Sequence, residues 1–275
     1  MERRVSAMST VPIGYAEHAP PEDLAAWVAC FWTQRTALGP NVTSAHRVLP
    51  DCCVDILMSF GGATDGDRAP DSEVSAAVGV GPMTKPLMVT GAGPRLYLGV
   101  RFRPGRAYAA LGIPASELLD DTVDFGVLAR EARMELDTLS SQTTDEERLA
   151  AMIALVRRRM RHAAAVPPSV SAAVRRIGGA QGNLRIASLA ADMGITRQQL
   201  ARQFATHVGL SPKMLARVMR VQAALARADA ARAAYPRNVD WSGIAYDLGY
   251  YDQPHFIDDF KALTGATPGD WTVRP

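Results

Sequence analysis

An internal repeat in the C-terminal part of the chain constrains the fold more than any other feature. Residues 184–210 and 239–268 show the same order of apolar side chains, glycine and proline, at a spacing of about 55 residues. Such a repeat rarely arises by chance, so each copy is expected to form the same small structural unit. The sequence therefore predicts two similar units within one domain.

The first copy has the pattern of two short helices joined by a tight turn. Apolar residues recur at i, i+3, i+4 and i+7 over residues 186–193, which predicts one buried helix face. Gly194 follows, where the end of a helix favours a left-handed residue. Thr196 and Gln199 match a capping box, which predicts a second helix over residues 197–208. This is the layout of a helix-turn-helix unit, whose second helix can enter the major groove of DNA.

The second copy repeats this layout position by position. Its turn is expected at Gly249, and it closes with Pro268 as the first copy closes with Pro212. The corresponding core positions are Leu189 and Ile244, Leu200 and Phe256, and Phe204 and Phe260. Further helices are predicted over residues 169–178, 212–232, 241–248 and 253–264, the long one capped by Ser211. Two units held by one rigid helix can enter successive major-groove turns on one face of DNA.

Side chains predicted on the outer face of residues 197–208 suit base recognition. Arg197 and Arg202 can pair with guanine and Gln198 can pair with adenine, in each case through two hydrogen bonds. For one copy alone, an ordinary amphipathic helical hairpin is an equally good interpretation. The second copy removes most of that ambiguity, because a repeated pattern needs a shared explanation.

This order of residues closely resembles the DNA-binding domain of AraC/XylS-type transcription regulators. The resemblance covers residues 170–272 and includes the runs GITRQQLARQF and IAYDLGYYDQPHFIDDF and the closing residues Thr267, Pro268 and Trp271. It implies two helix-turn-helix units that bind promoter or operator DNA. It places the base-reading residues of the first unit at Gln198, Ala201 and Arg202, flanked by Arg197 and Gln199, and those of the second unit at Gln253, His255 and Asp258.

One departure from this family concerns the charge of the second unit. Asp258 and Asp259 fall where many relatives carry a basic side chain. Phosphate repels an acidic side chain, although an aspartate can accept a hydrogen bond from cytosine N4. We therefore expect the second unit to bind DNA more weakly than the first.

Residues 1–125 show the alternation and the turn residues of short antiparallel strands. Strand-like runs cover residues 45–60, 73–80, 87–90 and 95–102, with glycine and proline between them. Helices are expected over residues 22–32 and from near residue 106. The pattern predicts a small barrel or sandwich. Residues 47–57 and 99–105 also resemble an N-terminal domain type of uncharacterised AraC-like proteins, which implies a cupin-like β-barrel for ligand sensing or dimerisation.

Charged side chains on or beside these strands form the candidate ligand site. A small barrel can hold one small molecule at its mouth. The candidate residues are Arg47, Asp51, Cys52, Asp55, Arg101 and Arg103. The alternative is that an Arg101–Asp55 or Arg47–Asp51 ion pair only stabilises the barrel. The adjacent Cys52 and Cys53 leave a thiol-sensing role open, whereas the few, unpaired histidines predict no metal and no cofactor.

Residues 126–168 are expected to connect the two domains. Helices are predicted over residues 127–139 and 144–162, the second starting at a capping box of Thr144 and Glu147. They fit either a dimerisation or coupling element or helices that pack on their own chain. The predicted fold class is α+β: a small cupin-like β-barrel over residues 1–125, this helical connector, and an all-α domain with two helix-turn-helix units over residues 169–275.

Charge and composition narrow the class of function. From Val166 onward, 13 lysines and arginines stand against 8 aspartates, a net charge of +5, whereas residues 1–165 carry −3. A basic C-terminal part fits a polyanionic partner. No apolar run is long enough to cross a bilayer, and the arginines near the N-terminus are not followed by the apolar stretch of a secretory signal. We therefore expect a cytoplasmic DNA-binding regulator.

The part played by the N-terminal domain stays open between two hypotheses. In the first, it binds a small-molecule effector; in the second, the regulator is ligand-independent and this domain dimerises or binds another protein. An enzyme is not expected, because the sequence shows no nucleophile–base pair and no histidine-rich metal motif. The expected partners are double-stranded DNA, a small-molecule effector, a second copy of the chain in a homodimer and, for an activator, RNA polymerase; no membrane is expected.

Overall fold

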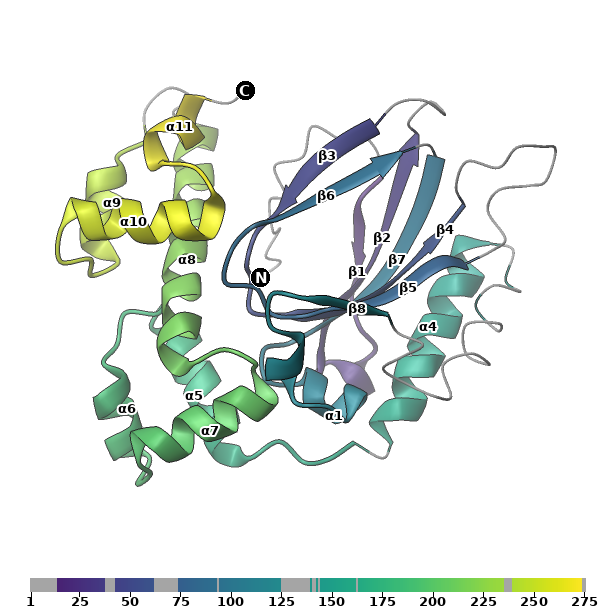
Figure 1. The fold of residues 1–275 in the computed structure, drawn as a ribbon, viewed down its shortest axis with the longest axis horizontal. Coiled ribbons are helices and arrows are strands. Elements are labelled where there is room, and N and C mark those ends of the chain that lie inside the picture. Colours follow the sequence, from purple (N-terminus) through teal and green to yellow (C-terminus); the bar gives the residue numbers. More distant parts are fainter. Residues whose placement is uncertain are drawn as a thin grey trace.

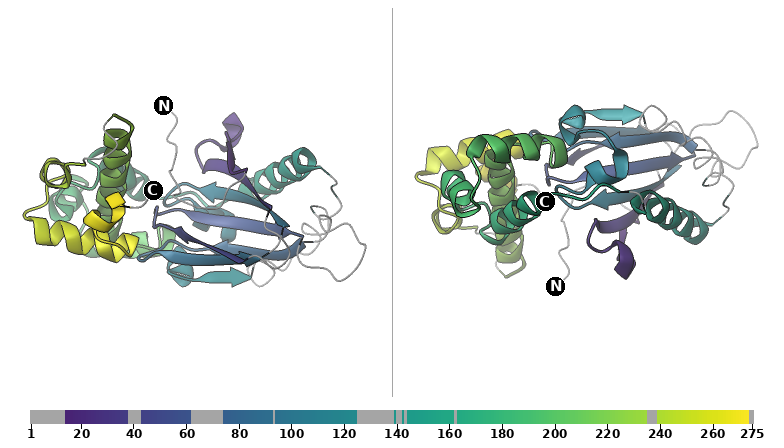
Figure 2. Two further views of the ribbon diagram at one scale, coloured as in Figure 1. Left: turned by 90° about the horizontal axis from the view of Figure 1, so that it is seen from above. Right: turned by 90° about the horizontal axis from the view of Figure 1, so that it is seen from below.

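The chain folds into a strand-rich part and a helical part that lie side by side (Figure 1). The computed structural model describes residues 14–37, 43–61, 74–92, 94–124, 139, 142, 144–161, 163–234 and 239–273. In both views of Figure 2 the helical part lies at one end of the strands. The α+β class predicted from the sequence is confirmed, with strands in the N-terminal part and helices in the C-terminal part.

The strands form an open sheet and a separate ribbon. They are β1 (Ala16–His18), β2 (Val28–Ala37), β3 (Thr43–Val48), β4 (Val54–Phe60), β5 (Val74–Val80), β6 (Leu87–Ala92), β7 (Pro94–Phe102) and β8 (Thr122–Asp124). Six of them make one antiparallel sheet in the order β1-β2-β7-β4-β5-β8, and β3 pairs with β6. The prediction of a strand-rich N-terminal domain is confirmed. Within the described ranges, however, no sheet closes on itself to form a barrel.

The prediction of a helix over residues 22–32 is wrong. Only a 3₁₀ turn, η1 (Glu22–Leu24), forms there, and strand β2 begins at Val28. Cys30, Phe31 and Trp32 are all buried, so both faces of this strand are covered. A strand buried on both faces lacks polar–apolar alternation, and its continuous apolar run cannot be distinguished from a buried helix by periodicity.

Helix α4 (Asp145–Met160) packs on the sheet. Its inward residues Met152, Leu155 and Val156 belong to the same hydrophobic cluster as the strand residues. The predicted capping box at Thr144 is confirmed. The described helix of the connector therefore packs on its own chain, together with the short helices α1 (Ala107–Leu111) and η2 (Ala115–Leu118). The helix predicted over residues 127–139 lies outside the described residues, apart from Leu139.

The helical part follows the sequence prediction closely. Its helices are α5 (Pro168–Gly179), α6 (Ile186–Asp192), α7 (Arg197–His207), α8 (Pro212–Ala234), α9 (Trp241–Asp247), α10 (Gln253–Thr264) and α11 (Pro268–Val273). The first unit is α6 and α7, and the second is α9 and α10. Core residues of both units, including Leu189, Phe204 and Phe260, join one cluster with the long helix α8. The two units thus share one hydrophobic core.

Candidate nucleic-acid interface

Helix α7 presents a polar outer face because its apolar side chains point into the core. Leu200 and Phe204 are 0% exposed. The helix begins with the predicted capping box: the Thr196 hydroxyl accepts a hydrogen bond from the backbone N–H of Gln199 at 3.1 Å. In return, Oε1 of Gln199 accepts one from the backbone N–H of Thr196 at 2.9 Å. This cap fixes where the helix starts and which side chains face outward.

The five contact residues predicted for the first unit are all exposed, namely Arg197, Gln198, Gln199, Ala201 and Arg202. They differ in whether their side chains already have a partner within the protein. The side-chain oxygen of Gln199 is occupied by the cap, so it can contact DNA only in competition with the start of its own helix. Among the described residues, the guanidinium groups of Arg197 and Arg202 have no ion-pair partner. Both positive charges are therefore available to a polyanion.

Helix α10 exposes the three contact residues predicted for the second unit, Gln253, His255 and Asp258. Asp252 caps the helix, and its carboxylate accepts a hydrogen bond from the backbone N–H of His255 at 2.9 Å. The exposed beginning of α10 therefore carries amide, imidazole and carboxylate groups, and no arginine. This composition agrees with the expectation that the second unit binds DNA more weakly than the first.

The expectation that Asp259 faces DNA beside Asp258 is wrong. Asp259 is only 4% exposed. Its carboxylate lies 2.7 Å from a guanidinium nitrogen of Arg217 on α8. Asp259 follows Phe256 by three residues, so it shares the inner face of α10 with that ring. The ion pair ties α10 to the long helix instead of facing phosphate.

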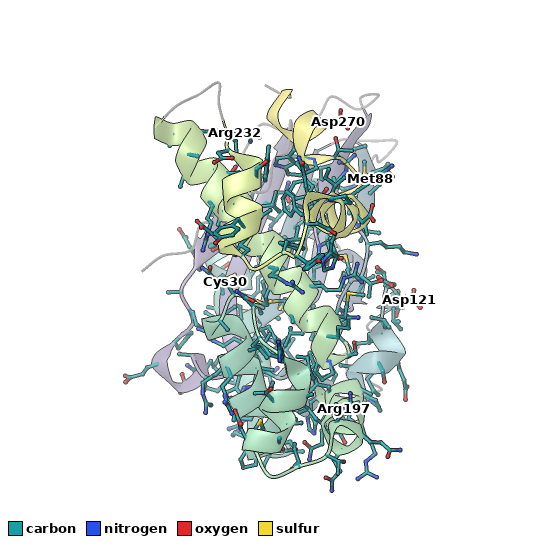
Figure 3. The ribbon with its side chains drawn as sticks, turned by 90° about the vertical axis from the view of Figure 1, so that its left-hand side faces the viewer. Cys30, Met88, Asp121, Arg197, Arg232 and Asp270 are labelled. Atoms are coloured by element: carbon teal, nitrogen blue, oxygen red, sulfur yellow. The ribbon has the colours of Figure 1, made fainter. Side chains whose placement is uncertain are left out.

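The two helices α7 and α10, called the reading helices below, lie beside α8 and run in the same general direction (Figure 1). Their first residues lie at the end remote from the sheet, and Figure 3 looks onto this side with Arg197 in view. The 23-residue helix α8 holds both reading helices: α7 leads into its start, and Asp259 of α10 forms an ion pair with its Arg217.

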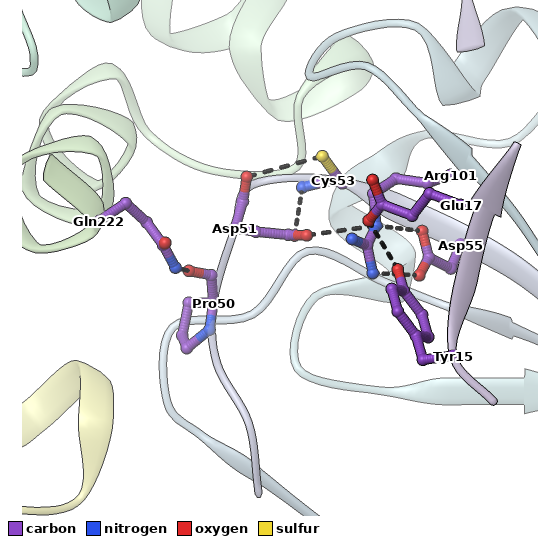
Figure 4. Close-up of polar contacts among 8 residues, drawn as sticks. All are labelled: Tyr15, Glu17, Pro50, Asp51, Cys53, Asp55, Arg101 and Gln222. Carbon is purple, nitrogen blue, oxygen red and sulfur yellow. Dashed lines mark hydrogen bonds and ion pairs between the residues drawn. The ribbon is translucent and has the colours of Figure 1, made fainter. Parts of the chain in front are cut away.

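Three of the six candidate ligand residues meet in one ion-pair network (Figure 4). Asp55 on β4 and Arg101 on β7 are directly opposite in the strand register. The guanidinium donates to both carboxylate oxygens of Asp55, at 3.1 and 3.0 Å, and lies 3.3 Å from Asp51. Burial disfavours the charged form of Arg101, but the two carboxylates outweigh it and raise its pKa. The Arg101–Asp55 pair that the sequence left open is thus present.

The other three candidate ligand residues point elsewhere. Arg47 donates to the backbone carbonyl of Thr264 at 3.0 Å, across to the helical part. Arg103 donates to the carbonyl of Ala25 at 2.9 Å. Cys52 is 1% exposed and packs in the cluster of the helical part. A ligand role for the six residues together stays a prediction.

The cysteine pair lies in the loop before β4, not on a strand. Cys52 has φ +65°, a backbone conformation that is uncommon for a residue with a side chain. Burial raises the pKa of its thiol well above the usual value. A thiol held protonated is a poor nucleophile. The geometry therefore gives no support to thiol sensing at Cys52.

Contacts between the two parts of the chain were not predicted from the sequence. Gln222 on α8 donates to the carbonyl of Pro50 at 2.5 Å (Figure 4). His207, the last residue of α7, is 8% exposed, and its ring lies 4.9 Å from that of Tyr108. Local patterns identify helix faces, but they do not tell which outward residue another domain will cover.

Metal sites and membrane-spanning helices have no candidate among the described residues. In that part of the chain, no group of three or more histidine, cysteine, aspartate or glutamate side chains is placed to hold a metal ion. None of the described helices is both long enough and apolar enough to cross a membrane.

Comparison with known proteins identifies each part of the chain separately. Residues 189–274 match a helix-turn-helix domain family, and residues 16–124 match a domain family of unknown function. No curated protein matches the chain.

Among solved structures, the chain is similar to ToxT from Vibrio cholerae. ToxT bound to (E)-4-(8-methylnaphthalen-1-yl)but-3-enoic acid has a TM-score of 0.44 and 10% identity, over 88% of this chain and 98% of that chain. ToxT bound to an unsaturated fatty acid has a TM-score of 0.38 and 13% identity, over 88% and 94%. Likeness at this level carries no inference about a ligand of this chain. The family matches do identify its parts: residues 189–274 match the AraC-type helix-turn-helix domain family, and residues 16–124 match a domain family of unknown function.

Proposed function

We propose that the chain regulates transcription in the cytoplasm by binding a specific DNA sequence with both reading helices. The observation that carries this proposal is the shared orientation of α7 and α10, whose exposed first turns lie on one side of the molecule (Figures 1 and 3). Helices presented in this way can enter two successive major grooves of one duplex without bending of α8.

The two units contribute different chemistry to this binding. In the first, Arg202 and Gln198 contact base edges, and Arg197 contacts either an edge or a phosphate. In the second, Gln253 and His255 contact base edges, and Asp258 accepts from cytosine or stays at the rim. Most of the electrostatic attraction comes from the first unit, because the second exposes no arginine on its reading helix.

The strand-rich part serves, in this proposal, as the regulatory domain. A small-molecule effector or a protein partner would act on it, and its direct contacts with the helical part would carry the effect to the DNA-binding units. A second copy of the chain and, for an activator, RNA polymerase are the further partners that this function implies. Because the candidate ligand residues fall into an ion-pair network and interdomain contacts, a ligand-independent domain is the alternative.

Selection of bound fragments from genomic DNA with the purified full chain tests the function. We expect recovery of one motif made of two segments about 10 base pairs apart, with binding that weakens as salt rises. Equal binding to recovered and random duplexes would contradict the proposal. A thermal-shift screen with small metabolites then separates the two regulatory hypotheses, because a true effector stabilises the folded state by mass action.

A further inference from the structure

The turn of the second helix-turn-helix unit carries one residue more than the turn of the first. Helix α7 begins three residues after Gly194, whereas α10 begins four residues after Gly249. The glycines correspond, since both adopt positive φ, +66° and +73°. Beyond them, Ile195 corresponds to the buried Tyr250. The additional residue of the second unit is therefore Tyr251.

Tyr251 is 94% exposed, and Tyr246 near the end of α9 is 82% exposed. Single exposed aromatic residues are ordinary on a protein surface and need no explanation. These two differ because they bracket one turn, directly before the exposed start of reading helix α10. Among the described residues, neither hydroxyl has a hydrogen-bond partner. Both therefore offer an unused donor beside the place where DNA would lie.

The charge of α10 gives these tyrosines a role. Its exposed start carries Asp252 and Asp258 and no arginine, so it needs contacts to phosphate that do not depend on positive charge. A tyrosine hydroxyl donates a hydrogen bond to phosphate oxygen, and its ring covers the adjoining sugar. Because it is neutral, this contact releases no condensed counterion.

We propose that Tyr246 and Tyr251 bind the phosphate–sugar backbone of DNA and anchor the second unit. This inference rests on the proposed function. It adds an explanation of how reading helix α10, whose exposed start carries no arginine, stays bound to DNA. It assigns to the second unit a contact that is insensitive to salt, whereas the first unit depends on the charges of Arg197 and Arg202.

The test uses the full chain and the duplex recovered by genomic selection. The double variant Tyr246→Phe/Tyr251→Phe removes two hydroxyls and nothing else. We expect its affinity to fall by about three- to tenfold per hydroxyl, with an unchanged slope of log affinity against log salt. Tyr15→Phe, in the strand-rich part, is the matched control and should bind as the unchanged chain does. The unfolding midpoint should not move, because both tyrosines are exposed.

Three results would overturn this inference while leaving DNA binding intact. They are an unchanged affinity of the double variant, a loss accompanied by a lower salt slope, and a loss of transcriptional activation with unchanged DNA affinity. The last would show that the tyrosines meet a protein. If the unchanged chain itself does not prefer the recovered duplex, the proposed function fails instead.

A second observation concerns the other ends of the reading helices. Gly209 and Gly265 each stand 12 residues after the first residue of their helix and adopt φ of +77° and +76°. A Cβ atom on Gly209 would lie 2.6 Å from the carbonyl oxygen of Ala115. One on Gly265 would lie 3.2 Å from Cγ of Pro86, beside the guanidinium of Arg47. Corresponding positions of both units thus rest on the strand-rich part.

From this symmetry we infer that the strand-rich part fixes the placement of one reading helix relative to the other. It supports both helices at the end away from DNA, and Gln222 attaches the middle of α8 to the same part. A change in that part would therefore alter the DNA spacing that the two units accept together.

Gly209→Ala tests this second inference, with Gly112→Ala, at the end of α1, as its matched control. Both replacements put alanine at positive φ, but Gly112 has open space around it and Gly209 meets Ala115. The probe is a set of duplexes in which the two recovered segments are moved apart one base pair at a time. We expect Gly209→Ala to weaken the preference for the best spacing about tenfold, which is about 1.4 kcal/mol, and Gly112→Ala to keep it. A preserved preference in Gly209→Ala, or an equal loss in both variants, would overturn the inference.

Discussion

Replacement of Arg202 by alanine is expected to weaken binding to the recovered duplex by about ten- to a hundredfold. A bidentate arginine–guanine contact contributes about 1–3 kcal/mol of discrimination between bases. Arg202 is exposed on α7, and its guanidinium has no ion-pair partner within the described part of the chain. Its charge is therefore not needed for the fold. Titration of labelled duplexes that differ at single base pairs measures the effect.

The variant should also lose its preference at one base pair only, because each base-reading side chain serves one position. Arg157→Ala provides the matched control: it removes the same charge from α4, where Arg157 is exposed and paired with Asp23. That variant should bind DNA as the unchanged chain does. A uniform loss across all duplexes would show that Arg202 contacts phosphate, and no loss at all would remove it from the interface.

Replacement of Phe260 by alanine is expected to lower the free energy of unfolding by about 3–5 kcal/mol, the usual cost of a large aromatic cavity in a core. Phe260 is 0% exposed. Its ring lies 5.1 Å from Trp241, 5.6 Å from Phe256 and 5.8 Å from Trp271, centroid to centroid. Such aromatic contacts add to the effect of burial. Denaturant unfolding of the full chain, followed by circular dichroism, measures the loss.

Phe60→Ala is the companion variant, because Phe60 is equally buried but belongs to the cluster of the strand-rich part. If the two clusters unfold in separate transitions, Phe260→Ala should shift the helical transition and Phe60→Ala the other. If they unfold together, both variants should shift one common transition. A loss below about 1 kcal/mol for Phe260→Ala would mean that the second unit repacks around the cavity.

The helices could be predicted well because their signals are local. Thr196 and Gln199 mark the start of α7 by a cap that needs only four residues, and the ends of α10 were predicted at the residues where they occur. Periodicity placed four candidate DNA-binding side chains outward, those of Arg197, Gln198, Ala201 and Arg202. The family resemblance supplied the other four, and all eight are exposed. That they bind DNA stays a prediction, since exposure is necessary for contact but does not prove it.

The strand-rich part was predicted less well because its architecture depends on distant partners. Strand β2 was taken for a helix, since its burial on both faces depends on how distant parts of the chain pack and not on its own sequence. Closure of a sheet likewise depends on which edge strands meet. The role of Arg47 could not be inferred, because its partner is the carbonyl of Thr264, 217 residues away.

The ion pair between Asp259 and Arg217 changes the electrostatic description of α10. Counted from sequence, this helix carries two aspartates and one lysine, an excess of negative charge. With Asp259 neutralised inside the core by Arg217, its outer surface retains one aspartate and one lysine and is electroneutral. Because Arg217 is paired with Asp259, its positive charge is not available to DNA either. The exposed N-cap Asp252 adds a negative charge beside Asp258, so a duplex approaching the start of α10 is not attracted by net charge, and shape and hydrogen bonding decide the contact.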